Sequence, residues 1–416
     1  MNILLISGSD LKGGAARVAH SLGRTLLGRG HAVRMLAGEK TGDDDWVCSI
    51  DEASSGSGKL RAGLHRAGLN GLHLDSSFPG SISADQLEGV DVVHLHDPAH
   101  FNLRHLPALS RRVPVVMTLH TMAPFTGNCL YSMGCERYRE RCGDCPQKDE
   151  FPLHYLHRDA SGAMVRMKRW LYGRSEVYPV GVSQWVADRA RESAVLGRKE
   201  IHVVPNGIDL SRFPVQDTIS CKRQLGIPPG TGTILLSISP DMEDRRKGID
   251  VAVAALQLLG RENLMLLPLG ITPGGDELSE MLQYLPVPSL PPRHLESEEQ
   301  LALHYGAADV VWHPSRADTS SMVSMEAMSC GTPVIAARVG GVPEVVIEGE
   351  SGVLIPPENA EALAEATRSI FRDRLALNRL SKSAARIARE RHDVERMTTD
   401  YLEVYHGAMA RHRRPE

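Results

Sequence analysis

The chain has 416 residues, of which 42% are hydrophobic and 24% are charged, and its formal net charge is −4. This length predicts two or three domains, and the composition is typical of a globular protein with a sizeable core. The slightly negative charge and the 5% aromatic content argue against a nucleic-acid partner and against bulk attraction to anionic membranes.

The N-terminal residues MNILLISG carry no basic start, and their apolar run is too short for a signal peptide. No segment approaches the roughly 18 apolar residues of a membrane span. We therefore expect a cytoplasmic protein with small-molecule partners and no transmembrane segment. Residues 157–174 are basic and partly amphipathic, and this stretch favours peripheral contact with the inner membrane surface as a second location.

Short apolar runs alternate with amphipathic stretches in the first half of the chain. We expect strands at residues 2–6, 31–37, 90–95, 113–119, 178–182 and 201–204, and a helix at residues 15–28. Valine-rich runs of this kind suit parallel strands that are buried on both faces. The turn-forming segment 205–209 (PNGID) follows, where a hinge is expected.

A second series of elements starts near residue 233. It comprises strands at 233–238, 264–269, 309–313, 333–336 and 352–355, helices at 248–259, 298–307 and 322–329, and a charged helical tail from 361. Two such series predict an α/β protein with two doubly wound, Rossmann-like domains facing each other across a cleft. The expected domains are residues 1–207 with a C-terminal helix of about 395–416, and residues 208–394. Ligands should bind beyond the carboxyl ends of the strands.

Two loops at these strand ends are suited to a phosphate. Gly13 and Gly14 stand between a strand and a helix, where a ligand could approach the backbone and an anion could meet the helix N-terminus. Arg245, Arg246 and Lys247 cluster after the first strand of the second series and could neutralise a diphosphate. The structural alternatives are a flexible turn for the glycines and a solvated basic turn for the cations.

A third loop carries two acids with seven residues between them, in SRADTSSMVSME. Thr319, Ser320 and Ser321 follow Asp318 just before a helix, where a phosphate could sit, although Asp318 could equally cap that helix. Glu326 lies beside the apolar positions of Met322, Met325 and Met328. A buried Glu326 would need a partner such as ligand hydroxyls, and the alternative is a glutamate on the helix surface.

Histidines and cysteines mark two further candidate sites. His120 ends the apolar run 113–119 as a potential ligand contact or a structural histidine, and His94 and His96 are weaker candidates of the same kind. Cys129, Cys135, Cys142 and Cys145 have the spacing C-x5-C-x6-C-x2-C, and its last pair is typical of half a tetrahedral zinc site. Structural zinc is the favoured interpretation, with free thiols or disulfides as alternatives.

Several of these motifs, in order along the chain, resemble glycosyltransferase family 4. Residues 309–357 resemble the family signature, and GGAARVA (13–19), GVSQWVADRARES (181–193), VVPNGIDLSRF (203–213) and RRKGID (245–250) are similar to further family segments. The segment 118–147 resembles a subgroup with a Cys-rich insertion, known from exopolysaccharide synthesis. The resemblance implies a retaining enzyme of GT-B architecture that uses a nucleotide-diphosphate sugar, with an acceptor-side first domain and a donor-binding second domain.

The resemblance also implies roles for single residues. Lys247 and Arg246 would bind the diphosphate and stabilise it as the leaving group, and Gly14, beside Gly13, would approach it from the other domain. Asp318 and the backbone of the residues that follow it would hold the transferred sugar, and Glu326 would hold the ribose. His120 would face the sugar, so the catalytic residues would be His120, Lys247 and Asp318. The full expected donor site is Gly13, Gly14, Arg246, Lys247, Asp318, Thr319, Ser320, Ser321, Met322 and Glu326.

The sequence departs from the family at Asp318, where Glu is usual, and at Thr319–Ser321, where Gly-Phe-Gly is usual. The choice between GDP and UDP, the sugar and the acceptor therefore stay open. A soluble natural-product or antibiotic intermediate and a lipid-linked polysaccharide precursor are equal acceptor candidates. No catalytic metal is expected, because side-chain cations supply the charge. The alternatives to a transferase are a GT-B-fold sugar-nucleotide epimerase and a non-catalytic sugar-nucleotide-binding protein.

Overall fold

The computed structural model describes residues 1–50, 63, 67, 69, 87–96, 101–150, 158–237, 244–260, 262–270, 284–291, 295 and 297–412. These residues form two compact units. Unit 1 comprises Met1–Asn206 and Val394–Glu416, and unit 2 comprises Gly207–Asp393. The assignment of an acceptor side and a donor side to these units stays a prediction.

Unit 1 is built on a parallel sheet of order β3-β2-β1-β4-β5-β6-β7. Its strands are β1 (Asn2–Ser9), β2 (Ala32–Glu39), β3 (Val47–Ser49), β4 (Val92–His96), β5 (Val115–Leu119), β6 (Val177–Gly181) and β7 (His202–Val203). Every residue of β4, β5 and β6 is buried, which confirms that the valine-rich runs form strands covered on both faces. The strand order reverses between β1 and β4, and this is the point where a doubly wound sheet binds its ligand.

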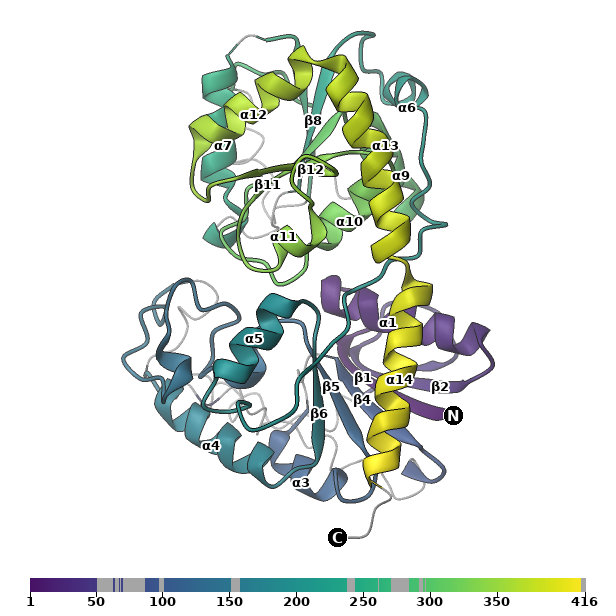
Figure 1. Ribbon diagram of the computed structural model, residues 1–416, viewed down its shortest axis with the longest axis vertical. Coiled ribbons are helices and arrows are strands. Elements are labelled where there is room, and N and C mark those ends of the chain that lie inside the picture. The colour runs from purple at the N-terminus through teal and green to yellow at the C-terminus, as the bar shows by residue number, and fades with distance from the viewer. Residues whose placement is uncertain are drawn as a thin grey trace. The chain divides into compact units, whose positions relative to one another are not determined.

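Helices cover both faces of this sheet (Figure 1). They are α1 (Gly14–Gly28), α3 (Leu106–Leu109), α4 (Ser161–Gly173), α5 (Gln184–Glu192) and α14 (Val394–His412), with short 3-10 turns η4 (Leu103–His105), η5 (Ala123–Phe125) and η6 (Arg137–Arg139). The last helix, α14, comes from the far end of the chain and packs against α1 and β5.

Unit 2 contains a parallel sheet of order β12-β11-β10-β8-β9. The strands are β8 (Gly232–Ser237), β9 (Leu264–Leu269), β10 (Val310–His313), β11 (Val334–Ala337) and β12 (Gly352–Ile355). The helices are α6 (Thr218–Gln224), α7 (Ile249–Leu259), α9 (Glu298–Ala307), α10 (Met322–Ser329), α11 (Val342–Val345), α12 (Ala360–Arg372) and α13 (Arg374–Arg391), and η7 (Arg245–Lys247) is a 3-10 turn. The strand order reverses between β8 and β10, so the ligand point of this sheet lies between their carboxyl ends.

The core of unit 2 has two layers, because alternate residues of each strand face opposite sides of the sheet. Leu235 and Val311 pack with α9, α10 and α13, whereas Leu236 and Trp312 pack with α7 and α12. Figure 1 shows these two groups of helices on the two sides of the sheet. The predicted tail helix is broken at Asp373, where α13 begins with its N-cap.

Among the described residues, no helix is long and apolar enough to cross a membrane. The predicted strand end at residue 238, the loop residues 241–243, residue 157 of the basic stretch and the final residues 413–416 lie outside the described part of the chain.

Candidate functional site

The loop between β10 and α10 holds Asp318 in a buried, charged position. Its Oδ1 accepts a hydrogen bond from the Ser320 amide at 3.0 Å, and its Oδ2 lies 3.3 Å from Nε2 of His313, at ion-pair distance but outside hydrogen-bond geometry. Burial alone would raise the pKa of Asp318, but His313, the charge of Lys247 and the Ser320 amide together hold that pKa well below its usual range. The carboxylate is therefore ionised at neutral pH and can accept hydrogen bonds.

A close backbone contact fixes the position of Asp318. The Gly341 amide donates to the Asp318 carbonyl at 3.0 Å. Gly340 has a φ of +54°, and a Cβ at this residue would lie 1.9 Å from the Asp318 carbonyl oxygen. Only glycine fits at position 340, and this close contact between the two backbone segments holds the Asp318 loop in place.

Arg316 ties the basic turn η7 to the Asp318 loop. Its Nη1 donates to the Arg245 carbonyl at 2.6 Å, and its backbone amide donates to the Arg246 carbonyl at 2.7 Å. The side chain is 10% exposed and pairs with Asp250, at 2.6 Å, and with Glu358. Arg316 was not predicted as a site residue, because a single arginine in a loop carries no sequence signal of a partner 66 residues away.

The two predicted cations of η7 lie at the strand-order reversal of unit 2. Lys247 is half-buried; burial lowers its pKa, and the Asp318 carboxylate acts in the opposite direction. Arg246 Nη2 donates to Asp244 Oδ2 at 2.8 Å. The turn ends at Gly248, where a Cβ would lie 2.2 Å from the carbonyl oxygen of residue 314. The turn is thus packed against the β10 loop and does not extend into solvent as a loose basic segment.

Glu326 is buried within α10, where it is 1% exposed, so the alternative of a surface glutamate is wrong. Its Oε2 accepts a hydrogen bond from the hydroxyl of Tyr305, in α9, at 2.9 Å. Met325 and Met328 are buried beside it, and Met322 is half-buried. Ligand hydroxyls were the predicted partners of Glu326, and no sequence signal identified Tyr305, which lies in the last turn of the predicted helix 298–307.

The three hydroxyl residues before α10 are all buried, with exposures of 4% for Thr319, 8% for Ser320 and 2% for Ser321. Ser321 is the N-cap: its Oγ accepts from the Ser324 amide at 3.2 Å. The alternative in which Asp318 caps the helix is therefore wrong. The carboxylate of Asp318 faces Ser320 and His313 instead.

In unit 1 the glycine loop opens onto solvent at the start of α1. Gly13 and Gly14 are exposed, and Gly13 has a φ of +86° with open space where a Cβ would be. The first turn of α1 has no acidic side chain. Asp10, which is buried, braces the loop by accepting hydrogen bonds from the amides of Thr41 at 2.9 Å and Gly42 at 2.7 Å. An anion could approach this helix N-terminus without repulsion from its first turn.

The three histidines of the sequence analysis come together at the carboxyl ends of β4 and β5. His120 Nε2 lies 3.0 Å from His96 Nδ1, and His96 Nε2 lies 3.2 Å from His94 Nδ1. Burial lowers the pKa of His120 to about 3. His120 is therefore neutral at physiological pH, and it occupies the predicted strand end.

The four clustered cysteines line one small cavity, together with residues such as Asn128, Gln147 and Ser161. All seven cysteines of the chain are free, so the disulfide alternative is wrong for this structure. Burial raises the pKa of Cys129 to about 12. Lys168, in α4, is buried beneath the insertion and donates to the carbonyls of Ala123, Thr126 and Gly127 at 2.7, 3.0 and 3.1 Å. Within the described ranges, however, no three His, Cys, Asp or Glu side chains are grouped as a metal ion requires.

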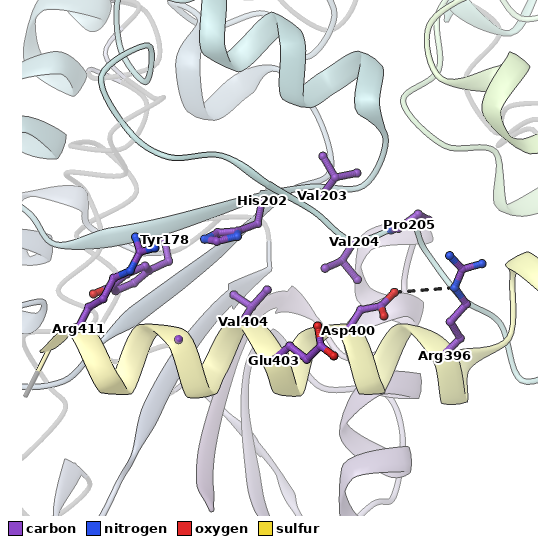
Figure 2. Close-up of a pocket in the computed structure, with 11 residues that line it drawn as sticks. Tyr178, His202, Val203, Val204, Pro205, Arg396, Asp400, Glu403, Val404 and Arg411 are labelled. Atoms are coloured by element: carbon purple, nitrogen blue, oxygen red, sulfur yellow. Dashed lines mark ion pairs between the residues drawn. The ribbon is translucent and has the colours of Figure 1, made fainter.

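A separate groove of unit 1 runs between β7 and α14 (Figure 2). Tyr178, His202, Arg396, Asp400 and Arg411 are among its lining residues, and Arg396 pairs with Asp400 at 3.9 Å. None of the predicted site residues lines this groove. This groove is therefore separate from the candidate sites described above.

Two doubly wound units with their polar loops at the strand-order reversals define a GT-B glycosyltransferase fold. Solved structures agree. Sucrose-phosphate synthase from Thermosynechococcus elongatus matches with a TM-score of 0.71 and 22% identity, covering 99% of this chain and 100% of that one. Anabaena HepE in complex with UDP-glucose matches with a TM-score of 0.68 and 19% identity, covering 98% and 100%.

The chain belongs to glycosyltransferase family 4. The model of that family matches residues 12–212, and the model of glycosyl transferases group 1 matches residues 232–387. The D-inositol 3-phosphate glycosyltransferase of Pseudarthrobacter chlorophenolicus is 31% identical over 72% of this chain and 66% of its own length. That of Xylanimonas cellulosilytica is 31% identical over 78% of this chain and 73% of its own length.

Proposed function

We propose that the protein is a retaining, hexosyl-transferring glycosyltransferase that uses a nucleotide-diphosphate sugar. The observation that carries this proposal is the strand-order reversal of unit 2, where Lys247, Arg246 and the ionised Asp318 gather on two loops locked together by Arg316. Cations beside a fixed carboxylate suit a diphosphate attached to a sugar. The relatives are named glycosyltransferases, and HepE has been solved with UDP and with UDP-glucose.

In this proposal each donor group has its own partner in unit 2. Lys247 and Arg246 bind the diphosphate. Asp318 accepts hydrogen bonds from hydroxyls of the transferred sugar, and the backbone N–H groups of residues 319–322 bind the same sugar. Glu326 holds the ribose hydroxyls. Since Tyr305 already donates to Oε2 of Glu326, the carboxylate is oriented before the nucleotide arrives.

Unit 1 supplies the glycine loop and a neutral histidine. Gly13 and Gly14 let the diphosphate approach the helix N-terminus, where the backbone dipole favours an anion. His120 faces the transferred sugar, and an uncharged imidazole can donate a hydrogen bond without adding a positive charge near the reacting carbon.

The proposed reaction is a front-face displacement. The bond from the anomeric carbon to the β-phosphate oxygen breaks, and the new bond to the acceptor oxygen forms on the same face. The proton of the acceptor hydroxyl passes to the departing phosphate oxygen. Fixed cations stabilise the charge that develops there, so no catalytic metal is required by this scheme.

The acceptor and the location are finer parts of the proposal. The relatives' name, D-inositol 3-phosphate glycosyltransferase, supports a phosphorylated cyclitol as the first soluble acceptor to test. A lipid-linked precursor is supported by α4, whose exposed face carries Met167, Trp170, Arg166 and Arg169, with Arg174 stacked 4.4 Å from the Trp170 ring centroid. Such a face suits a protein that works in the cytoplasm and contacts the inner membrane surface.

The experiment is a thermal-shift comparison of UDP, GDP, ADP and TDP, followed by turnover with sugars of the nucleotide that stabilises most. We expect UDP to stabilise the protein, Asp318→Asn and Glu326→Gln to abolish most turnover, and Glu365→Gln, on the exposed face of α12, to leave it unchanged. Conversion of the donor into an epimeric sugar nucleotide without any acceptor would show an epimerase instead. The absence of stabilisation by all four nucleotides would refute the proposal.

We also propose that the four thiols of the cysteine cavity close around a structural zinc ion, a rearrangement that is required because the described side chains are not grouped as a metal ion needs. Four thiols on one cavity and the nearby buried Lys168 ammonium, which favours thiolates, support this. Elemental analysis of the purified protein should find about one zinc per chain, and Cys142→Ser should remove it and lower the melting temperature. Fully reactive thiols without bound metal in the purified protein would contradict the proposal.

A further inference from the structure

A chain of buried rings and hydroxyls connects the C-terminal helix to His120. The Tyr405 hydroxyl lies 2.7 Å from His94 Nδ1, and the Tyr401 hydroxyl lies 2.7 Å from Thr118 Oγ1. Thr118 Oγ1 in turn lies 2.7 Å from His94 Nε2. His94 leads through His96 to Nε2 of His120. We call this set, His94, His96, His120, Thr118, Tyr401 and Tyr405, the histidine relay.

Every member of the histidine relay is buried. Burial, reinforced by the neighbouring rings, lowers the pKa of His94 and His96 well below the usual range, and burial lowers that of His120 to about 3. Tyr401 and Tyr405 have raised pKa values for the same reason. The charged forms of all five rings are thus disfavoured, and each imidazole carries one proton.

The position of each proton follows from the contacts of His94 Nδ1, which faces both His96 Nε2 at 3.2 Å and the Tyr405 oxygen at 2.7 Å. A protonated Nδ1 can share its hydrogen between two acceptors. An unprotonated Nδ1 has one lone pair, which cannot accept from both neighbours. The arrangement with hydrogen on His94 Nδ1 is therefore favoured.

The remaining protons are then determined in sequence. His94 Nε2 accepts from Thr118, and Thr118 accepts from Tyr401. His96 Nε2 accepts from His94, so the single proton of His96 is on Nδ1 and is donated to Nε2 of His120. His120 must carry its own proton on Nδ1.

We propose that the histidine relay holds His120 as the neutral Nδ1–H tautomer, and that His96, Tyr401 and Tyr405 are positioning residues for it. A carboxylate partner would also fix a tautomer, but it would favour the cationic ring. A relay of neutral groups fixes the tautomer without adding charge. The catalytic consequence rests on the proposed function, because there His120 contacts the transferred sugar, whereas the tautomer itself does not depend on any substrate.

The test uses the full-length protein labelled with ¹⁵N-histidine, and solid-state NMR at pH 7.5 distinguishes protonated from unprotonated ring nitrogens. The His120 signals are identified by their loss in His120→Gln. We expect a protonated Nδ1 and an unprotonated Nε2 in the native protein. Tyr405→Phe should give a mixture of both tautomers, because it removes the oxygen that favours one of them.

The matched control is Tyr172→Phe. Tyr172 is a fully buried tyrosine of the same unit, and its hydroxyl contacts Met117 Sδ at 3.7 Å, outside the relay. This variant should leave the tautomer unchanged. A His120 protonated on Nε2, a cationic His120, or equal spectra for the two tyrosine variants would overturn the inference.

A kinetic measurement tests whether the tautomer of His120 affects turnover. Tyr405→Phe should lower kcat by about two- to tenfold with a smaller change in donor KM, and Tyr172→Phe should lower neither. If the native protein shows the expected tautomer but turns over no nucleotide sugar, the proposed function fails and the relay stands. If turnover is normal and the tautomer is Nε2–H, the relay fails alone.

Discussion

The contact between Gly340 and Asp318 leads to a prediction whose size can be worked out from the structure. Gly340→Ala places a Cβ on a residue with a φ of +54° and 1.9 Å from the Asp318 carbonyl oxygen. The left-handed backbone costs about 1–2 kcal/mol for a residue with a Cβ. Relief of the clash by backbone movement adds about 1–3 kcal/mol. The total loss in the free energy of unfolding should be about 2–5 kcal/mol.

Gly349→Ala is the matched control. Gly349 has a φ of +72°, but no atom lies within 4 Å of the position where its Cβ would be. It should therefore lose only the backbone part, about 1–2 kcal/mol. For a unit of about 150–250 residues, 1 kcal/mol corresponds to about 2–4 °C in Tm. The expected decreases are thus about 4–20 °C for Gly340→Ala and about 2–8 °C for Gly349→Ala.

The assay is urea unfolding of both variants beside the native protein, with donor turnover measured under conditions where each variant remains folded. Gly340→Ala should also lose turnover, because the backbone that moves carries Asp318. Gly349→Ala should keep it. Equal stabilities of the two variants, within about 0.5 kcal/mol, would refute the steric argument.

Three further outcomes are expected. Because the folded pKa of His120 is about 3, the unfolded chain binds a proton below pH 6.5 that the folded chain does not, so His120 alone should contribute about 2 kcal/mol to the loss of stability from pH 6.5 to 5, in addition to the losses from His94 and His96. His120→Gln should make this part of the pH profile of urea unfolding shallower by about that amount, and an unchanged slope would contradict the burial argument. Tyr305→Phe removes a donor from buried Glu326 and should lower the unfolding free energy by about 1–3 kcal/mol, whereas a neutral effect would mean that their hydrogen bond does not contribute. In the zinc-free protein, burial lowers the pKa of Lys168 to about 8, so between pH 8 and 10 the unfolded chain keeps a proton on Lys168 that the folded chain releases. Stability of the zinc-free protein should therefore rise by about 2 kcal/mol from pH 8 to 10, and Lys168→Met should remove that rise.

The alternation of strands and helices predicted most of the fold, because buried parallel strands such as 115–119 have an unmistakable run of apolar residues. Ligands in such sheets bind beyond the carboxyl ends of the strands, and this rule predicted that the basic turn and the Asp318 loop belong to one site. The alternative in which Asp318 caps α10 fails because three hydroxyl residues lie between Asp318 and the helix, and Ser321, the one adjacent to the helix, is the N-cap.

Long-range partners could not be predicted. Tyr305, Arg316 and Tyr405 act through contacts with residues far away in the chain, and the separation of His94 from Tyr405 is 311 residues. One signal was nevertheless present: His94 and His96 occupy alternate positions of a strand and must share a face. Tyr401 and Tyr405 are four residues apart in a helix and must also lie on one face of it. Each pair therefore places two polar side chains on the same face of its element.

The helix α14 belongs to unit 1 although it is the last element of the chain, and this has a consequence for synthesis on the ribosome. Domains usually fold in the order in which they are made. Unit 2, residues 207–393, is continuous and can complete its sheet as it emerges. Unit 1 lacks Tyr401 and Tyr405 until α14 (Val394–His412) has been made, so a nascent chain without this helix holds His94 without its Tyr405 partner. The histidine relay can therefore form only after α14 has been synthesised, later than the sheet of unit 2.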